Sequence, residues 1–341
     1  MVKNLCYNDK HGLTTFRKSI LIIKITIIII ITIFVSFQTT GVIESNSNLA
    51  YGSLDNKNLP DFNFAAAGDW GCTQSAKDTV RNILHKNPEL VLGLGDYSYQ
   101  NTADCWIRLV EPLEHKMKIA IGNHEHLLYL NGTYSYPSPS LLQQYMVHFN
   151  LTKQYYSFEY QNVHFIVIST EVPFKPDSDQ YDFVENDLKK SASDPNIEWI
   201  VALYHKLAYT SPSFLDSIPA LRNTYHPLFE KYDVDLVLQG HSHNYQRTFP
   251  IMYNNRTTAG PIITENEKTS YLNPKGQIFA TVGTGGVPEI HNFTGARTNF
   301  TAVQFNAFGF LNIDVIHNGT QLVGRFYDND GTIKDRFKII K

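Results

Sequence analysis

The chain has 341 residues, of which 43% are hydrophobic and 18% are charged, and its formal net charge at pH 7 is −3. This length and composition supply enough apolar side chains for one large packed domain or two ordinary ones, and they do not indicate disorder. The small net charge gives no general attraction to nucleic acid or to acidic membrane surfaces.

The N-terminal region is expected to lie outside the fold. Residues 1–18 are basic and precede an almost wholly apolar run at residues 19–37, interrupted by Lys24. A basic flank before an apolar run places residues 1–18 in the cytoplasm and the rest of the chain outside it. The run is short enough for a signal-peptide core and barely long enough for a bilayer span, so a cleaved signal and an uncleaved anchor both fit. Residues 38–60 are polar and form a predicted linker before a folded domain at residues 61–341.

Two further features fit export from the cytoplasm. The chain carries six Asn-x-Thr sequons, which suit a glycosylated outer-surface protein. Their asparagines are Asn131, Asn150, Asn255, Asn292, Asn299 and Asn318. Cys6 precedes the apolar run, which leaves Cys72 and Cys105 either to pair outside the cell or to remain two separate buried thiols. We therefore expect an extracytoplasmic protein, either anchored in the membrane by residues 19–37 or secreted.

From residue 61 onward, apolar runs alternate with amphipathic stretches. The predicted strands lie at residues 61–69, 89–96, 118–124, 155–160, 163–170, 198–205, 234–241, 277–283, 308–316, 321–328 and 332–340. The predicted helices lie at residues 75–86, 103–115, 138–149, 178–192 and 219–231. This alternation predicts an α/β domain with largely parallel strand pairing, and the strand-rich C-terminal end suggests a second sheet.

Polar side chains gather where the apolar strands stop. In chain order they are Asp69, Asp96 with Tyr99, Asn123 with His124, His205, and His241 with His243. Any one of them could be an ordinary turn residue or helix cap. Five strands that each end in a potential metal ligand make that reading improbable, because sites in α/β sheets form at the carboxyl ends of strands. Glycine precedes four of these residues, and it lets the backbone turn sharply and approach a ligand closely.

The motifs "GDWG", "GDYSY", "GNHEH", "VALYH" and "GHSH" occur in this order and resemble those of the calcineurin-like metallophosphoesterase superfamily. Within it the chain resembles the purple acid phosphatases, because Tyr99 follows Asp96 by three residues and "GHSHNYQR" is similar to their Gly-His-x-His-x-Tyr-x-Arg. The resemblance runs from Asp69 to Arg247. It implies a sandwich of two mixed β-sheets flanked by helices, with residues 61–341 as the catalytic domain. It also implies a dinuclear-metal acid phosphatase that hydrolyses phosphate monoesters by attack of a metal-activated hydroxide.

The resemblance assigns seven metal ligands to two ions. Asp96 would bridge the two ions. The ligands of one ion would be Asp69, Tyr99 and His243, and those of the other would be Asn123, His205 and His241. Carboxylate and phenolate donors suit Fe(III), whereas neutral imidazoles and an amide suit a divalent ion, for which Fe, Zn and Mn are all candidates. The two histidines of "HSH" lie on the same side of an extended segment, so each can face one ion.

The resemblance also implies catalytic roles around the metals. His124 would donate a proton to the leaving alkoxide, which requires a protonated ring and favours acidic pH. His126 would assist or orient it. Tyr245 and Arg247 either line the pocket or are a packed side chain and an exposed charge.

The chain departs from many relatives in one motif. They carry a further histidine about ten residues after the motif that ends at His205, and the stretch "HKLAYTSPSF" has none. Tyr209 or Lys206 would take its place, or substrate handling differs. From residue 61 onward, the histidines outside the motifs are expected to be surface or core residues; they are His85, His115, His148, His164, His226, His291 and His317.

Three functions remain open at this point. The leading one is a phosphomonoesterase that acts on a small phosphate ester, with the membrane as a partner only if residues 19–37 are retained. A phosphodiesterase or nucleotidase could use the same metal site. A non-catalytic surface-binding glycoprotein could also use the fold. No nucleic-acid partner is expected, because the chain has no basic stripe.

Overall fold

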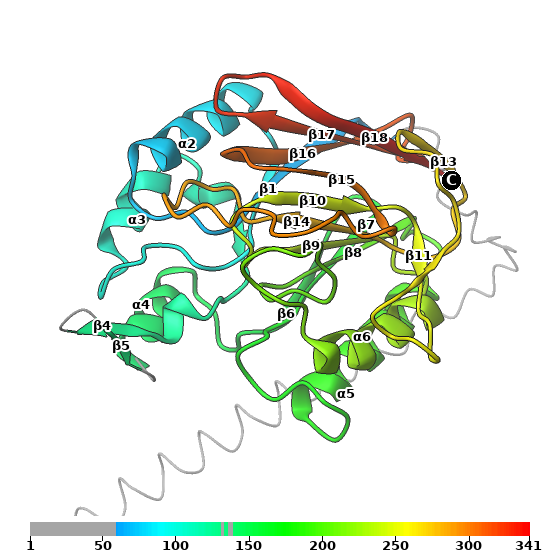
Figure 1. The fold of residues 1–341 in the computed structure, drawn as a ribbon, viewed down its shortest axis with the longest axis horizontal. Helices are drawn as coiled ribbons and strands as arrows, with labels where there is room; N and C mark the ends of the chain where they lie inside the picture. Colours follow the sequence, from blue (N-terminus) through cyan, green and yellow to red (C-terminus); the bar gives the residue numbers. More distant parts are fainter. Residues whose placement is uncertain (1–58, 131–132, 136–138) are drawn as a thin grey trace, which may run out of the picture. The chain divides into compact units, whose positions relative to one another are not determined.

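Two seven-stranded mixed sheets form the core of the computed structural model, which describes residues 59–130, 133–135 and 139–341 (Figure 1). The strand order is β13-β18-β17-β16-β1-β2-β3 in the first sheet and β15-β10-β14-β9-β8-β7-β6 in the second. All the described residues belong to one compact unit. The predicted cytoplasmic segment, the signal or anchor at residues 19–37 and nearly all of the linker lie outside them.

The first sheet combines strands from both ends of the domain. Its strands are β1 (Phe62–Ala67), β2 (Leu90–Gly93), β3 (Met117–Ile119), β13 (Ser270–Leu272), β16 (Gly309–Ile316), β17 (Gln321–Asp328) and β18 (Ile333–Ile340). β1, β2 and β3 are parallel, whereas β16 pairs antiparallel with β1. A second sheet is present, as expected, but of the predicted C-terminal strands only the one at Ile278–Val282 belongs to it, whereas β16, β17 and β18 extend the sheet that β1 begins.

The second sheet begins with the predicted hairpin. Its strands are β6 (Tyr156–Tyr160), β7 (Val163–Val167), β8 (Trp199–Leu203), β9 (Leu236–Gln239), β10 (Tyr245–Thr248), β14 (Ile278–Val282) and β15 (Thr301–Phe305). β7, β8, β9 and β14 are parallel to their neighbours among this group. Two small two-stranded sheets join β4 (Leu128–Leu130) to β5 (Thr133–Ser135) and β11 (Ile251–Met252) to β12 (Ile262–Ile263).

Helices cover the outer faces of both sheets (Figure 1). They are α2 (Gln74–Lys86), α3 (Asp104–Val110), α4 (Pro139–His148), α5 (Asp179–Ser191) and α6 (Pro219–Lys231). α3 is shorter than the predicted helix at residues 103–115, because Pro112 lacks the N–H that would continue the hydrogen bonds of the helix. A separate 3₁₀ turn follows at Glu114–Lys116. Among the described residues, no helix has both the length and the apolarity to cross a bilayer.

Alternating side chains of β1 show how the layers are held together. Phe64 points into the core between the sheets, where its ring meets that of Phe165 from β7 at a centroid distance of 5.2 Å. Ala65 and Ala67 point the other way and pack under α2 and α3. This alternation is that of a strand buried on both faces. Two mixed sheets flanked by helices are the architecture that the sequence predicts, and that prediction is confirmed.

Candidate metal centre

The predicted ligands lie in loops at the carboxyl ends of strands from both sheets. Asp69, Asp96 and Asn123 follow β1, β2 and β3 of the first sheet, whereas His205 and His241 follow β8 and β9 of the second. His243 lies just before β10. The two sheets therefore meet at this site, and each supplies part of the donor set.

The glycines before the ligands serve mainly to allow close approach. Of the four, only Gly95 has a positive φ, of 90°. A Cβ on Gly240 would lie 2.8 Å from the carbonyl oxygen of Leu94 and 2.9 Å from Oδ2 of Asp69. Such contacts leave no room for a side chain at Gly240, so the backbone there packs directly against the Asp69 carboxylate.

The first group of donors is Asp69, Tyr99 and His243. The Tyr99 hydroxyl oxygen lies 3.2 Å from Oδ1 of Asp69 and 3.0 Å from Nε2 of His243. Nε2 of His243 is 3.4 Å from the same Asp69 oxygen. Nδ1 of His243 donates to the carbonyl oxygen of Glu289, which leaves Nε2 to face the other two donors.

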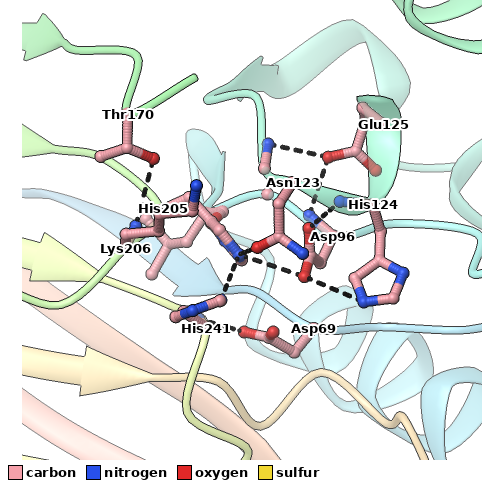
Figure 2. Close-up of polar contacts among 12 residues, drawn as sticks. Asp69, Asp96, Asn123, His124, Glu125, Thr170, His205, Lys206 and His241 are labelled. Carbon is pink, nitrogen blue, oxygen red and sulfur yellow. Dashed lines mark hydrogen bonds and ion pairs between the residues drawn. The ribbon is translucent and has the colours of Figure 1, made fainter. Parts of the chain in front are cut away.

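The second group is Asn123, His205 and His241 (Figure 2). Nε2 of His205 lies 3.1 Å from Oδ1 of Asn123 and 3.1 Å from Nδ1 of His241. Nδ1 of His205 donates to the carbonyl oxygen of Leu94 over 2.8 Å, which aims Nε2 at the centre. Donor atoms of Asp96, His205 and His241 all lie within 4.8 Å of one another.

Oδ2 of Asp96 lies between the two groups. It is 3.1 Å from Nε2 of His205 in the second group and 3.5 Å from the Tyr99 hydroxyl in the first. The other oxygen, Oδ1, accepts the backbone N–H of His124 over 2.8 Å. One carboxylate oxygen thus fixes the loop while the other faces both groups, as a bridging ligand requires.

The donor chemistry fits metal ions in both groups. Nε2 of His205 contacts two oxygen acceptors, Oδ1 of Asn123 and Oδ2 of Asp96, and lies as close to Nδ1 of His241. A single proton cannot satisfy both oxygens fully, whereas a cation among them would contact every lone pair. The single proton of the Tyr99 hydroxyl likewise faces two carboxylate oxygens, of Asp69 and Asp96. Oxygen and imidazole donors in this combination suit iron, zinc or manganese.

The electrostatics of the second group favour a positive charge beside Asp96. Burial alone would raise the pKa of Asp96, but His205 and His124 lower it well below the usual aspartate range. Burial opposes a charged ring at His205, yet the Asp96 carboxylate raises its pKa to about 10. Burial and the nearby His205 charge lower the pKa of His241 to about 3. A cation bound here would replace the proton that His205 otherwise holds.

The surroundings of Tyr99 oppose ionisation of its phenol. Burial and the carboxylates of Asp69 and Asp96 raise the pKa of Tyr99 well above its usual value. The protein alone therefore keeps the phenol protonated. A phenolate at this position requires a highly charged cation in contact with it.

The two predicted catalytic histidines occupy different surroundings. The His124 ring packs against that of Tyr99 with centroids 4.2 Å apart and an interplanar angle of 37°, and its Nε2 is 3.8 Å from Oδ2 of Asp96. Burial lowers the pKa of His124 although Asp96 opposes this, so its protonated form requires acidic pH. His126 hydrogen-bonds through Nε2 to Oε1 of Gln154 over 3.3 Å, a residue outside the donor set.

Four residues that the sequence suggested for the substrate pocket are either buried away from it or paired with other side chains. Tyr245 and Arg247 are fully buried between the sheets, where both bond to Asp335. Tyr209 is buried against α6 and bonds to His226 over 2.7 Å. Lys206, which lies next to His205 (Figure 2), pairs with Glu171 over 2.9 Å.

Glu125 is a site residue that the strand-end pattern does not identify. Its carboxylate is buried and accepts three backbone N–H groups, from Asp96 at 2.9 Å, Tyr97 at 2.8 Å and Gly122 at 2.8 Å. It thereby ties the loop after β2 to the loop after β3 (Figure 2). Burial and the Asp96 charge raise the pKa of Glu125 to about 8. Its place in "GNHEH", directly after Asn123 and His124, is the signal that could have identified it.

A cavity of about 470 Å³ opens over the centre. It is lined by Asp96, Tyr99, Asn123, His124, His241 and His243, and also by Phe214 and His291. His291 is expected from the sequence to be a surface or core residue, and it is buried, but it also contacts a predicted ligand. Its ring stacks on that of His243 at a centroid distance of 3.8 Å and an interplanar angle of 10°. The sequence gives no sign of this contact, because His291 lies 48 residues beyond His243.

A disulfide joins Cys72 and Cys105, whose Cα atoms are 6.0 Å apart. It links the loop that follows Asp69 to α3. This is the pairing that the sequence left open.

The asparagines of five sequons lie among the residues whose exposure is described, and all five are exposed; they are Asn150, Asn255, Asn292, Asn299 and Asn318.

Comparison with known proteins decides the family. Residues 62–245, more than half of the chain, match the model of the calcineurin-like phosphoesterases. The chain belongs to this family. It is 28% identical over 287 residues to probable inactive purple acid phosphatase 1 of Arabidopsis thaliana, covering 78% of this chain and 45% of that protein. It is 30% identical over 233 residues to purple acid phosphatase 22 of the same plant, covering 65% and 50%.

The chain spans about half the length of these two curated relatives. A solved structure of a purple acid phosphatase from yellow lupin (Lupinus luteus) seeds superposes with a TM-score of 0.68 at 23% identity, covering 83% of this chain and 54% of that one. This likeness shows the fold. The predicted resemblance to purple acid phosphatases is thereby confirmed, whereas the roles of the individual ligands stay predictions.

Proposed function

We propose that this protein is a dinuclear-metal acid phosphatase that hydrolyses phosphate monoesters outside the cytoplasm. The observation that carries the proposal is the position of Oδ2 of Asp96, 3.1 Å from Nε2 of His205 on one side and 3.5 Å from the Tyr99 hydroxyl on the other. Two donor groups that share one carboxylate oxygen are suited to a pair of ions rather than to a single ion.

The metals would be Fe(III) in the first group and a divalent iron, zinc or manganese ion in the second. The carboxylate and phenol of the first group are hard oxygen donors, and the second group offers two imidazoles and an amide oxygen. When bound, the two ions would supply the Lewis-acid chemistry that acidifies water and polarises a phosphoryl group.

The chain's own residues would complete the reaction. His124 lines the cavity beside Asp96, where its ring could protonate the leaving oxygen of the ester. Tyr99 supports the His124 ring by packing against it, at a centroid distance of 4.2 Å. Glu125 holds the backbone of the Asp96 loop, so that the carboxylate is fixed before substrate binds.

The relatives support a phosphatase but do not settle activity. Purple acid phosphatase 22 of Arabidopsis thaliana and the onion (Allium cepa) phosphoenolpyruvate phosphatase carry activity in their names, whereas another relative is named probable inactive. We assign activity to this chain because all seven predicted ligand residues are present and lie together, and a non-catalytic relative would be expected to lack some of them.

An extracytoplasmic location rests on independent features. A disulfide between Cys72 and Cys105 suits an oxidising compartment. The five described sequons have exposed asparagines, as glycosylation requires. The basic segment and apolar run at residues 1–37 provide the means of export or anchoring.

The first test is the visible absorption spectrum of the purified full chain, with its metal content measured alongside. A charge-transfer band from phenolate to Fe(III) is expected, and Tyr99→Phe should abolish it. Retention of the colour in Tyr99→Phe would place the iron elsewhere. A colourless wild-type protein with two divalent ions per chain would favour a phosphodiesterase or nucleotidase.

The second test is turnover of a phosphate monoester by Asp96→Asn. Loss of the shared carboxylate should reduce kcat by at least about 100-fold, since removal of one preorganised electrostatic group has effects of this size. Asp61→Asn is the matched control, because Asp61 is exposed and lies at the opposite end of β1 from Asp69. Full turnover by Asp96→Asn would contradict the dinuclear site, whereas absence of turnover in the metal-loaded wild type would favour a binding protein.

A further inference from the structure

The lining of the cavity over the metal centre combines two kinds of side chain. Predicted ligands and His124 contribute polar donors, and the apolar wall, as we call it, consists of Phe214, Leu215, Val287 and Pro288. An ester whose phosphoryl group lies at the donor groups would therefore have apolar side chains of the same cavity within reach of its alcohol part.

Phe214 is the most exposed aromatic residue of this wall. Its side chain is 69% exposed, although burial of an aromatic ring is favourable. A single exposed apolar side chain is ordinary on a protein surface, so exposure alone is no argument. The location is what matters, because this exposed ring also lines the cavity that holds the predicted ligands.

Contact with two further rings holds Phe214 in place. Its ring packs on that of His291 at a centroid distance of 4.9 Å, and His291 in turn stacks on His243 at 3.8 Å. Nδ1 of His291 accepts the backbone N–H of His243 over 3.1 Å, and the His291 carbonyl accepts from Asn244 over 2.8 Å. The support beneath Phe214 is thus buried and fixed by hydrogen bonds, which reduces the entropy that its ring would lose on contact with a ligand.

We propose that Phe214 is a specificity-determining residue that selects phosphate esters with an aromatic ring in their alcohol part, by stacking that ring beside the metal centre. The inference rests on the proposed function and names its substrate class. Two sources share this chemistry, an aryl phosphate and a nucleoside monophosphate. Stacking of one aromatic pair should change affinity about three- to tenfold.

The test begins with binding, which does not depend on turnover. Dissociation constants of phenylphosphonate and methylphosphonate are measured calorimetrically on the metal-loaded full chain. The wild type should bind phenylphosphonate about three- to tenfold more tightly. Phe214→Ala should remove this preference and Phe214→Trp should retain it. Leu272→Ala is the matched control, because Leu272 is 68% exposed and lies on β13, at the other edge of the first sheet from β3.

Turnover then identifies the source of the ring. Phenyl phosphate, a nucleoside 5′-monophosphate and glycerol 3-phosphate are compared in wild type and Phe214→Ala. The loss of kcat/KM should be confined to whichever aromatic ester stacks on Phe214, with glycerol 3-phosphate unchanged.

The outcomes separate the two proposals. Equal affinity of the wild type for both phosphonates, a preference that persists in Phe214→Ala, or failure to bind either phosphonate would overturn the role of Phe214. A preference for phenylphosphonate that depends on Phe214, without hydrolysis of any ester, would support the aromatic subsite and overturn the proposed phosphatase activity.

Discussion

Backbone conformation at single residues shows how strongly the donor loops are constrained. Four predicted ligands have φ angles in the left-handed region; they are Asp69 at 59°, Asp96 at 56°, Tyr99 at 53° and His241 at 68°. A residue with a Cβ loses roughly 1–2 kcal/mol in this conformation. The contacts that hold it include the N–H of His241 on Oδ2 of Asp69 and the N–H of His124 on Oδ1 of Asp96, each at 2.8 Å. Each of these carboxylates therefore both positions a loop and faces the centre.

Glu125 should be essential to that positioning. In Glu125→Gln an amide NH₂ replaces one of two oxygens that together accept three N–H groups, so at least one buried donor loses its partner. The free energy of unfolding should fall by about 1–3 kcal/mol, and the metal content per chain should fall with it. Urea unfolding and elemental analysis measure the two effects. Glu267→Gln, at an exposed position, is the control. Unchanged stability and metal content would mean that the loops after β2 and β3 keep their conformation without Glu125.

At the scale of elements, a buried ion pair connects the two sheets. Arg247 of β10 bonds to Asp335 of β18 through Nε at 2.6 Å and Nη2 at 3.0 Å. The hydroxyl of Tyr245 donates to the same carboxylate at 2.8 Å, and the guanidinium also donates to Tyr271 at 3.0 Å. Every charged group of this cluster thus has a partner, which is the condition for a buried ion pair to be tolerated.

Removal of one partner of this ion pair should lower the free energy of unfolding and leave kcat unchanged. Arg247→Met leaves Asp335 buried without its counter-charge, and stability should fall by about 3–5 kcal/mol. The double variant Arg247→Met with Asp335→Leu should recover much of this loss, because no unpaired charge remains. Denaturant unfolding measures both, and kcat of the folded fraction should stay unchanged. A fall in kcat without a loss of stability would return Arg247 to the substrate pocket.

The same strand shows where prediction from sequence reaches its limit. Apolar runs correctly located most strands of both sheets, and the polar residues at their ends correctly pointed to one cluster. β10 was missed because its fully buried tyrosine and arginine resemble a polar motif, and their partner Asp335 lies 88 residues further along the chain than Arg247. Phe214 and His291 were missed for a similar reason: loops distant in sequence bring them to the cavity.

At the scale of the whole molecule, the site lies where the two sheets meet and contains residues from both. Asp69, Asp96 and Asn123 come from the first sheet, whereas His205 and His241 come from the second. Ions bound among them would connect the sheets only in the folded state. Metal binding should therefore add to the stability of the domain by mass action.

Removal of metal should lower the melting temperature of the full chain. Ions present at 100 times their Kd stabilise the folded state by about 2.7 kcal/mol, and each kcal/mol corresponds to roughly 2–4 °C in a domain of this size. Chelation followed by gel filtration should therefore lower Tm by roughly 5–10 °C, and added metal should restore it. In Asp96→Asn the shift should be much smaller, because the shared ligand between the two groups is lost. Elemental analysis must first show that metal removal is complete. If the wild-type Tm then stays the same, the protein alone holds the donor groups together. The proposed role of the ions in connecting the two sheets would be wrong.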